Sequence, residues 1–303
     1  MALSEGFGFE ERWVRCALSE LARDPGLFDR SRIDHAQRVL GIGNRKVMAL
    51  WDWLEAAAFV TGERASARLT PLAKLALHYD PELREMGSLW IVHTNLSIPA
   101  AGIWFYHDYS LVFDARAFSK DELRDFLASR RSHSPAFIEK KCLAPLLQVM
   151  RKTRLGSDLG IMVHQGGDSF VRKCAIEESL SPAVFAYAAL MWARSAQAVT
   201  ANILQFTAPG GAGRLFTFDQ SMVKTYLNRV CDRYGNDALS YSGTAGLDSV
   251  AFSREVEPLH LIEAYYLEQL EGREPHVALE YARSEGLSAR LLADSENEAD
   301  SDG

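Results

Sequence analysis

The stretch that most limits how this chain can fold is LGIGNRKVMALWDWLEAAAFV, residues 40–60. Gly41 and Gly43 bracket Ile42 in a turn, where glycine accepts a positive φ without steric cost. Asn44 is a suitable N-cap for a following helix, because its carboxamide oxygen can accept from the free amides of the first turn. This spacing predicts a helix-turn-helix whose second helix begins at Asn44.

The second predicted helix has two different faces. Apolar residues recur at i, i+3, i+4 and i+7 and predict the face that packs on a core: Val47, Leu50, Trp51, Leu54 and Ala58. The opposite face combines small residues and cations: Arg45, Lys46, Ala49, Asp52, Trp53 and Ala56. Such a face suits insertion into a DNA major groove, although Asp52 would repel phosphate. We expect Asn44, Arg45 and Lys46 to contact DNA, and Arg45 to read a guanine edge.

The following residues, AFVTGERASARLT at 58–70, predict two short strands around a polar tip. Arg64 and Arg68 lie where a wing would touch phosphate or the minor groove. Thr70 and Pro71 have the residue types of an N-cap and a first helical position. The whole stretch therefore predicts a winged helix-turn-helix. The alternative is a helical packing module that does not bind DNA.

The rest of the chain predicts helices with a few hairpins. Ser119 and Glu122 form a capping box, and Ser134 with Pro135 begins a helix that Pro145 kinks or divides. Residues 155–174 predict a loop or an irregular hairpin. We therefore predict a mainly α (α+β) fold in three parts: a winged-helix DNA-binding domain with a helical extension at 1–155, a mostly helical domain with a hairpin at 156–290, and a disordered acidic tail at 291–303.

Charge argues against a uniformly basic nucleic-acid binder, since the formal net charge is −7. Five acidic residues of the tail contribute −5, so −7 plus 5 leaves about −2 for the body. A near-neutral body can still carry a basic stripe. We expect a second DNA-contacting cluster at Arg151, Lys152 and Arg154, for which a solvated charged surface is the alternative.

Four cysteines lie far apart without metal-ligand spacing, which predicts neither a zinc site nor a disulfide framework and fits a reducing cytoplasm. The chain has no apolar run of transmembrane length and does not open on a signal peptide, so we expect no membrane association. The glycine-rich residues 207–218 lack the Gly-Lys-Ser/Thr of a phosphate loop. We therefore expect no nucleotide or organic cofactor.

One segment combines side chains that suit phosphodiester chemistry: His164, Asp168, Arg172 and Lys173. In such a site Asp168 would hold a metal and a cation would meet the phosphate. A plain Gly-Gly-Asp turn is the alternative. Glu139 and Lys141 form a Glu-x-Lys pair like that of restriction-type nucleases, but they lie on a predicted helix where those enzymes use a strand.

Six stretches, taken in order, carry a resemblance to a known family: LGIGNRKVMALWDWLEAAAFV, LTPLAKLAL, SLWIVHTNL, FSKDEL, GAGRLFTFD and YSGTAGLDSVAF. From about Phe7 to Phe252 the chain resembles a bacterial domain-of-unknown-function family encoded beside sulfur-handling enzymes. Members of that family include the B component, a nickase, of the single-strand DNA phosphorothioation (Ssp) system, which serves in anti-phage defence.

The resemblance implies a protein that nicks double-stranded DNA alongside a cysteine desulfurase, a sulfur transferase and an ATPase. It implies phosphodiester hydrolysis in one strand, aided by a divalent metal such as magnesium or manganese, so that sulfur can replace a non-bridging oxygen. Under this reading Glu10, Glu11 and Asp168 are the candidates for metal or water chemistry. The alternative is a non-catalytic DNA-binding adaptor or regulator that brings the modification enzymes to their site.

Overall fold

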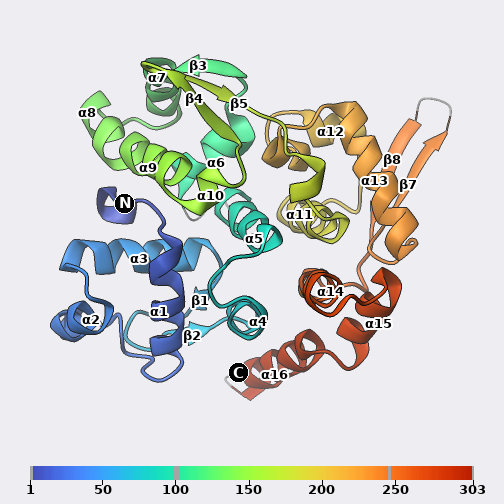
Figure 1. The fold of residues 1–303 in the computed structure, drawn as a ribbon, viewed down its shortest axis with the longest axis horizontal. Helices are drawn as coiled ribbons and strands as arrows, with labels where there is room; N and C mark the ends of the chain where they lie inside the picture. Colours follow the sequence, from blue (N-terminus) through green and yellow to red (C-terminus); the bar gives the residue numbers. More distant parts are fainter. Residues whose placement is uncertain (1–2, 99–102, 245–246, 302–303) are drawn as a thin grey trace. The chain divides into compact units, whose positions relative to one another are not determined.

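Helices form most of the chain in the computed structural model, which describes residues 3–98, 103–244 and 247–301 (Figure 1). The chain divides into two units. The first unit comprises Met1–Ala175 together with Leu215–Thr217, and the second comprises Ile176–Arg214 and Phe218–Gly303. A mainly α (α+β) fold was the prediction, and it is confirmed: the strands form small antiparallel sheets.

The first unit opens with a 3-10 helix at Leu3–Gly6 and contains ten α-helices within the described residues. These are α1 (Glu11–Leu21), α2 (Ile33–Leu40), α3 (Asn44–Ala56), α4 (Pro71–Tyr79), α5 (Met86–Ser97), α6 (Trp104–His107), α7 (Lys120–Arg130), α8 (Pro135–Ile138), α9 (Ala144–Lys152) and α10 (Arg154–Ser157). Its strands are β1 (Val60–Thr61), β2 (Arg68–Leu69), β3 (Ala117–Ser119), β4 (Met162–Gly166) and β5 (Ser169–Arg172).

The predicted turn between two helices is present at residues 41–43. Gly41 ends α2 in the left-handed region, with φ at 65°, which explains the need for glycine there. The N-cap of α3 is Gly43 rather than Asn44, and Asn44 is the first helical residue without a side-chain cap bond. The capping prediction was therefore wrong by one residue. β1 and β2 then pair antiparallel, with Val60 opposite Leu69.

Several helix starts follow the residue types that predicted them. The Thr70 hydroxyl accepts from the Ala73 amide ahead of Pro71, and Ser119 and Glu122 form the expected capping box. Ser134 caps α8 in the same way. A π-helical stretch at Glu139–Leu143 separates α8 from α9, so the helix is interrupted just before Pro145.

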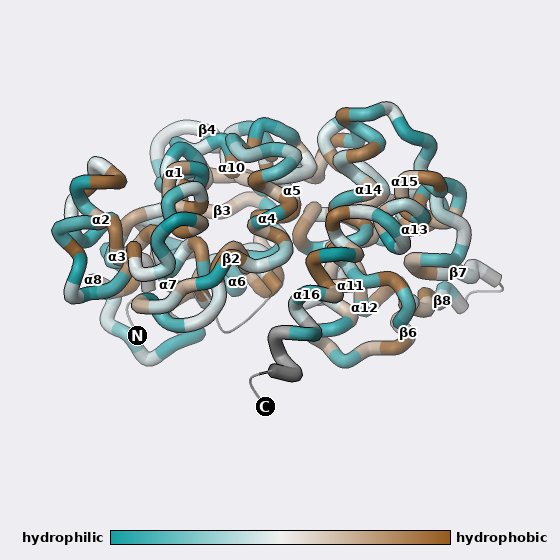
Figure 2. The backbone as a smooth tube through the Cα atoms, turned by 90° about the horizontal axis from the view of Figure 1, so that it is seen from below, coloured by the Kyte–Doolittle hydropathy of each residue, from teal (hydrophilic) through white to brown (hydrophobic). Residues whose placement is uncertain are grey.

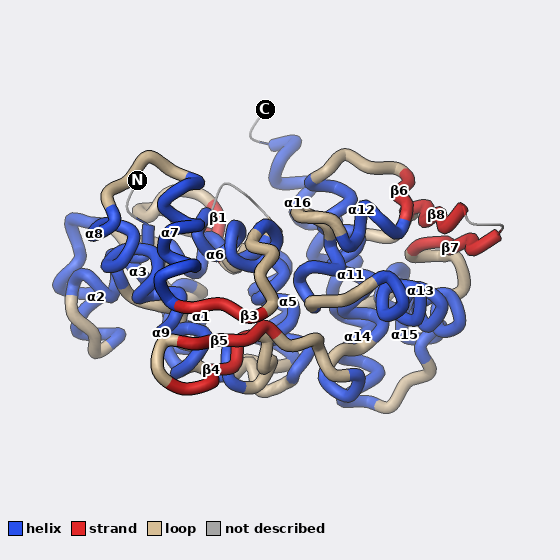
Figure 3. The backbone as a smooth tube through the Cα atoms, turned by 90° about the horizontal axis from the view of Figure 1, so that it is seen from above, coloured by secondary structure: helices blue, strands red, loops and turns tan. Residues whose placement is uncertain are grey.

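β3, β5 and β4 form a three-stranded antiparallel sheet in that order, and Figure 3 shows them side by side. Phe118 lies opposite Phe170 in the register, and their rings stack with centroids 5.7 Å apart. This pairing ties residues up to Ala175 into the first unit. The division of the chain therefore falls after Ala175, later than the boundary predicted near Gly156.

The core of the first unit centres on α5, whose residues Gly87 to Ser97 are all buried. His93 there lies between two hydrogen-bonding partners: its Nδ1 is 2.9 Å from the Tyr106 hydroxyl and its Nε2 is 3.2 Å from the Leu215 carbonyl. Burial lowers the pKa of His93 to about 3, so the ring is neutral. Because a carbonyl only accepts, Nε2 carries the proton and Tyr106 donates to Nδ1.

The second unit contains the remaining helices and a three-stranded antiparallel sheet in the order β6-β8-β7. Its helices are α11 (Pro182–Ser195), α12 (Ile203–Thr207), α13 (Gln220–Tyr234), α14 (Pro258–Glu271), α15 (Pro275–Ser284) and α16 (Leu287–Ser301). The strands are β6 (Thr200–Asn202), β7 (Leu239–Thr244) and β8 (Leu247–Phe252). Buried apolar residues of α11 and α14 supply much of this unit's core.

The acidic C-terminal segment forms α16 through Ser301, where the sequence predicted disorder from residue 291. A buried carboxylate anchors the start of this helix. The Glu263 side chain accepts from the amides of Leu287 and Ser288, each at 2.7 Å, and so pairs two of the free donors of the first turn. Gly286 leaves room for it, since a Cβ there would lie 2.4 Å from Glu263 Oε2.

Apolar and polar residues alternate along the helices of both units, as the hydropathy colouring of Figure 2 shows. That alternation is typical of helices with one face on a core and the other in water. Among the described helices, none is both long enough and apolar enough to cross a membrane.

Candidate functional site

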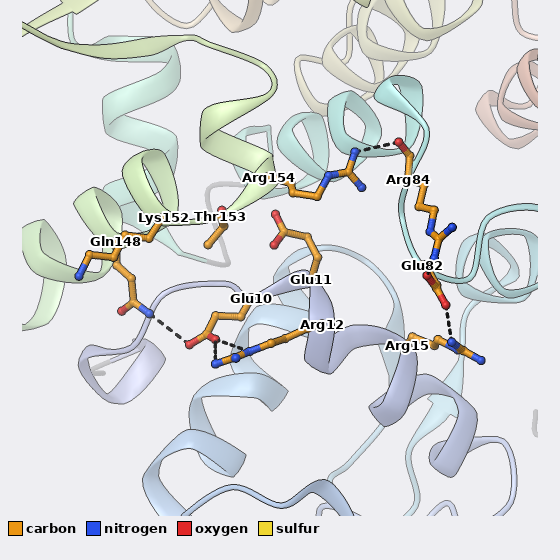
Figure 4. A pocket seen from close by; sticks show the side chains of 10 residues that line it. All are labelled: Glu10, Glu11, Arg12, Arg15, Glu82, Arg84, Gln148, Lys152, Thr153 and Arg154. Carbon is orange, nitrogen blue, oxygen red and sulfur yellow. Dashed lines mark hydrogen bonds and ion pairs between the residues drawn. The ribbon is translucent and has the colours of Figure 1, made fainter.

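A cleft of about 760 Å³ opens on the first unit, and Figure 4 shows the side chains around it. We call it the cationic cleft. Three stretches of chain surround it: the start of α1, the loop between α4 and α5, and the end of α9 with the start of α10. It is lined by Glu10, Glu11, Arg12, Arg15, Glu82, Arg84, Gln148, Lys152, Thr153 and Arg154.

Glu10 and Glu11 are placed by the start of α1, where Glu10 is the N-cap residue and Glu11 the first helical residue. A carboxylate in this position interacts favourably with the helix dipole. Glu11 also joins two elements, because its Oε1 accepts from the Leu155 amide of α10 at 2.5 Å. This bond holds the start of α1 against α10 and fixes the orientation of the Glu11 carboxylate.

Glu10 is surrounded by donors. Its Oε1 accepts from Lys46 Nζ and from Gln148 Nε2, both at 3.2 Å, and its Oε2 accepts from the Arg12 guanidinium at 2.6 Å. Partial burial opposes ionisation of Glu10, but the bonds from Lys46 and Arg12 outweigh it, and its pKa is lowered overall. Glu10 is therefore a charged residue that orients its neighbours.

Arg154 connects α10 to the loop between α4 and α5. Its guanidinium donates to the carbonyls of Leu83 and Arg84, each at 2.9 Å, and to Asp158 at 2.8 Å. All three of its nitrogens are engaged, so Arg154 positions the loop that carries Glu82 and Arg84. This arrangement leaves little donor capacity in Arg154 for a ligand.

The other cations of the cleft are more accessible. The side chains of Arg12, Arg15 and Arg84 are 67%, 56% and 74% exposed, and each forms an ion pair with Glu10 or Glu82. Lys152 is exposed and makes no hydrogen bond or ion pair with any residue that the structure describes. Five cations and three carboxylates line the opening, a balance of +2. The cleft is therefore suited to an anionic ligand.

Four residues predicted from the sequence meet in this cleft: Glu10, Glu11, Lys152 and Arg154. Arg151 is exposed beside Lys152 on α9 but does not line the opening. Six other lining residues were not predicted from the sequence as site residues: Arg12, Arg15, Glu82, Arg84, Gln148 and Thr153. Arg15 follows Glu11 by four residues, which places both on one face of α1, and this spacing was the available signal. Glu82 and Arg84 lie in a loop and carried no periodic signal.

Asp168, the third candidate for metal or water chemistry, lies elsewhere, in the turn between β4 and β5. Its backbone carbonyl accepts from the Lys120 amide, while His164 bonds to the Gly167 carbonyl. Arg172 is buried and donates to the carbonyls of Ser110 and Phe113. Residues 164–173 therefore form a hairpin in which His164 binds the turn and Arg172 is buried. As a residue for metal or water chemistry, Asp168 stays a prediction.

The expected DNA-facing side of α3 is buried. Ala49, Trp53 and Ala56 are 2%, 1% and 8% exposed, and residues 7–10 of the N-terminal segment lie against Ala49 and Trp53. Trp53 Nε1 donates to the Phe7 carbonyl at 2.8 Å, and the Phe9 ring packs against the Trp53 indole. The prediction that this face inserts into a groove failed because the small residues accommodate the chain's own N-terminal segment instead.

The cations of that region are mostly paired inside the first unit. Arg45 donates to the Glu5 carbonyl at 2.9 Å, and Lys46 bonds to Glu10. Arg64 forms a 2.6 Å ion pair with Asp52, which explains the acidic residue that suited DNA poorly. Arg68 is exposed on β2 and Asn44 is exposed at the start of α3. As DNA contacts, Asn44, Arg45, Lys46, Arg64 and Arg68 stay predictions.

The cleft does not fit a resident divalent metal as its side chains stand. Both oxygens of Glu10 accept from cations or an amide, and one oxygen of Glu11 accepts from a backbone amide. Within the described residues, no three His, Cys, Asp or Glu side chains gather closely enough to hold a metal ion. Glu139 and Lys141 form ion pairs with different residues. Glu139 pairs with Lys120, and Lys141 pairs with Glu5.

Comparison with known proteins places the chain in a family. Residues 2–266 match the family described as protein of unknown function (DUF4007), and the chain belongs to that family. No curated protein matches it. Two solved structures share its fold, each with a TM-score of 0.73 and 20% identity over 97% of this chain. One is a magnesium ion-bound SspB crystal structure, and the match covers 96% of that chain. The other is an SspB crystal structure, and the match covers 94% of that chain.

Proposed function

We propose that this protein is a DNA-binding component of an Ssp-type phosphorothioation system and that it nicks one strand of DNA held in the cationic cleft. The shared fold of the SspB structures and the family resemblance support the choice of system. The observation that carries the proposal is the gathering of five cations from three stretches of chain around one opening. Closely spaced cations recognise the phosphates of a nucleic-acid backbone.

Glu11 is the residue that we propose as general base for strand cleavage. Its Oε1 is fixed by the Leu155 amide, whereas Oε2 makes no hydrogen bond with a described residue. A water deprotonated there would form a new P–O bond. The P–O bond to one sugar would break, and the departing sugar oxygen would take up a proton. Lys152 and Arg12 would stabilise the charge on the phosphate.

A divalent metal, magnesium or manganese, remains part of the proposal because the family resemblance implies one. Magnesium often binds through one or two carboxylates together with substrate phosphates. The proposed cleavage step does not use a metal, since Glu10, Glu82 and one oxygen of Glu11 are already engaged with other groups. A cysteine desulfurase, a sulfur transferase and an ATPase are the proposed partners, in a cytoplasmic anti-phage system.

A non-catalytic DNA-binding adaptor is the second candidate function. The engagement of Glu10 with Lys46, Gln148 and Arg12 favours it, because a carboxylate held in this way orients cations and does not need to take part in chemistry. In this alternative the cleft would bind DNA for the modification enzymes without cutting it.

Supercoiled plasmid separates these two functions. We expect the purified protein to convert it to open circles with magnesium or manganese, and Glu11→Gln to abolish conversion while DNA binding persists. Glu178→Gln, at an exposed acidic position of the second unit, is the matched control and should nick like the wild type. Binding without any conversion would support the adaptor, and a fully active Glu11→Gln variant would exclude Glu11 as the base.

A further inference from the structure

A cluster of aromatic rings lies on the first unit at the loop between α7 and α8, outside the cationic cleft. The His133 and Phe137 ring centroids are 4.3 Å apart with an angle of 33° between the planes. Trp104 of α6 is 6.3 Å from His133 at 36°. The three rings therefore form a tilted column. We call these rings, with Arg131, the aromatic platform.

The platform is anchored at one end and open at the other. Trp104 is 9% exposed and fixes the column to the core, whereas His133 is exposed and Phe137 is partly exposed. Arg130 supports the loop through a 3.4 Å ion pair with the buried Asp108. A ring held in this way loses little conformational entropy when a second flat ring packs against it.

Cations accompany the rings. The exposed Arg131 guanidinium lies 5.6 Å from the Trp104 ring centre. Lys140 follows Phe137 by three residues on the continuing helix, is exposed, and has no hydrogen-bond or ion-pair partner in the described part of the chain. Exposed aromatic rings beside cations are the combination that single-stranded nucleic acids bind, with bases on the rings and phosphates on the cations.

One helical stretch runs from the platform to the edge of the cationic cleft, where Lys152 lies. The π-helical stretch and α9 present Lys140, Ala144, Leu147 and Arg151 outward, while the intervening apolar residues are buried. Lys152 of the cleft ends the same helix. From Lys140 to Lys152 the rise is roughly 18 Å at 1.5 Å per residue. About five stacked nucleotides cover that length at 3.4 Å each.

We propose that the aromatic platform binds unpaired bases of a DNA strand whose backbone continues towards the cationic cleft, so that the protein prefers a single-stranded segment. The continuation into the cleft rests on the proposed function, whereas the stacking of bases rests on the platform alone. Paired bases in a duplex cover their faces with neighbouring bases, so the platform discriminates against an intact duplex.

Binding measured by fluorescence anisotropy tests this inference with three labelled probes: a thymidine strand of about 20 nucleotides, an abasic strand of equal length, and a duplex. We expect His133→Ala to raise the Kd for the thymidine strand roughly tenfold, and to leave the abasic strand and the duplex within about twofold. Lys152→Ala should weaken all three. The matched control is His276→Ala, which removes an exposed histidine from α15.

The outcomes separate the two proposals. Equal weakening of the thymidine and abasic strands by His133→Ala, or no weakening at all, would overturn base stacking while leaving the cleft as a phosphate site. A wild-type protein that binds the abasic strand as tightly as the thymidine strand would do the same. A protein that binds none of the three probes would overturn the proposed function together with this inference.

Discussion

Two neighbouring cations of the cleft illustrate how differently residues of one charge behave. The Arg154 guanidinium donates hydrogen bonds to Leu83, Arg84 and Asp158. Lys152 has no hydrogen-bond or ion-pair partner among the described residues. A lysine that points into solvent keeps its full hydration until a phosphate displaces part of it. We therefore assign the phosphate contact to Lys152 and the shaping of the cleft to Arg154.

Lys152→Ala should make DNA binding less sensitive to salt. Each neutralised phosphate contributes about −0.9 to the slope of log K against log salt, so losing one contact should make the slope shallower by about one unit. Titrations at several salt concentrations measure it. Arg254→Ala, which removes an exposed cation from the second unit, is the control and should keep the wild-type slope. Equal slopes in all three proteins would place the phosphate contacts elsewhere.

His93 should make the protein less stable in acid. Its pKa is about 3 in the folded state, below its ordinary value of 6.5, so the unfolded chain takes up the proton first as pH falls. This contribution is complete above about pH 6.5 and is lost between pH 6.5 and pH 3. It amounts to about 1.4 kcal/mol per pH unit of unfolding free energy within that window.

His93→Gln tests this, because glutamine can donate to Leu215 and accept from Tyr106 but does not titrate. Urea unfolding at pH 7 and pH 5 should show a smaller loss of stability for the variant than for the wild type. His276→Gln removes an exposed histidine and should follow the wild type. A variant that loses as much stability as the wild type between these pH values would argue against His93 as the source.

At the scale of elements, local sequence signals predicted the starts of several helices correctly. They did not predict which residues the face of a helix contacts. Thr70, Ser119 and Ser134 cap the helices that they were expected to cap, because capping depends on residues within one turn. The outward face of α3 was predicted wrongly, since small residues suit a DNA groove and a packed chain segment equally. Only the distant position of Phe7 and Phe9 decides between them.

Phe9→Ala should therefore destabilise the first unit without improving DNA binding. Phe9 is 1% exposed and packs on Trp53, so its removal should cost about 3 to 5 kcal/mol of unfolding free energy. Urea unfolding and DNA titration measure the two effects. Leu204→Ala, at a position 63% exposed, should change neither. Tighter DNA binding by Phe9→Ala would mean that the buried face of α3 contacts DNA once it is uncovered.

For the whole molecule, the mainly α fold followed from hydrophobic periodicity, and part of the cleft followed from charges near helix ends. The rest depends on contacts between residues far apart in the chain, which no local pattern encodes. The loop that carries Glu82 and Arg84 is held at the cleft by Arg154, whose guanidinium binds carbonyls of that loop about 70 positions earlier in the chain. The acidic tail has the composition of a disordered segment, yet the buried Glu263 anchors its helix.

A fragment of residues 1–175 should not fold like the intact first unit. Leu215 supplies the carbonyl that His93 binds, Phe216 packs 5.2 Å from Trp90, and the Phe216 carbonyl accepts from Ala175. Without these residues a buried imidazole donor lacks its partner. We expect the fragment to unfold at lower urea than the full chain, with a weaker near-ultraviolet circular dichroism signal. A fragment as stable as the first unit of the full chain would contradict this.

The return of Leu215–Thr217 to the first unit also sets an order of events during synthesis. When Ala175 has been synthesised, the first unit still lacks these three residues. The ribosome must add residues 176–217 before the first unit is complete. At 5 to 20 residues per second this takes roughly 2 to 8 s. During that interval Trp90 and His93 lack the partners that cover them, so the nascent first unit passes through a stage at which chaperones can bind it.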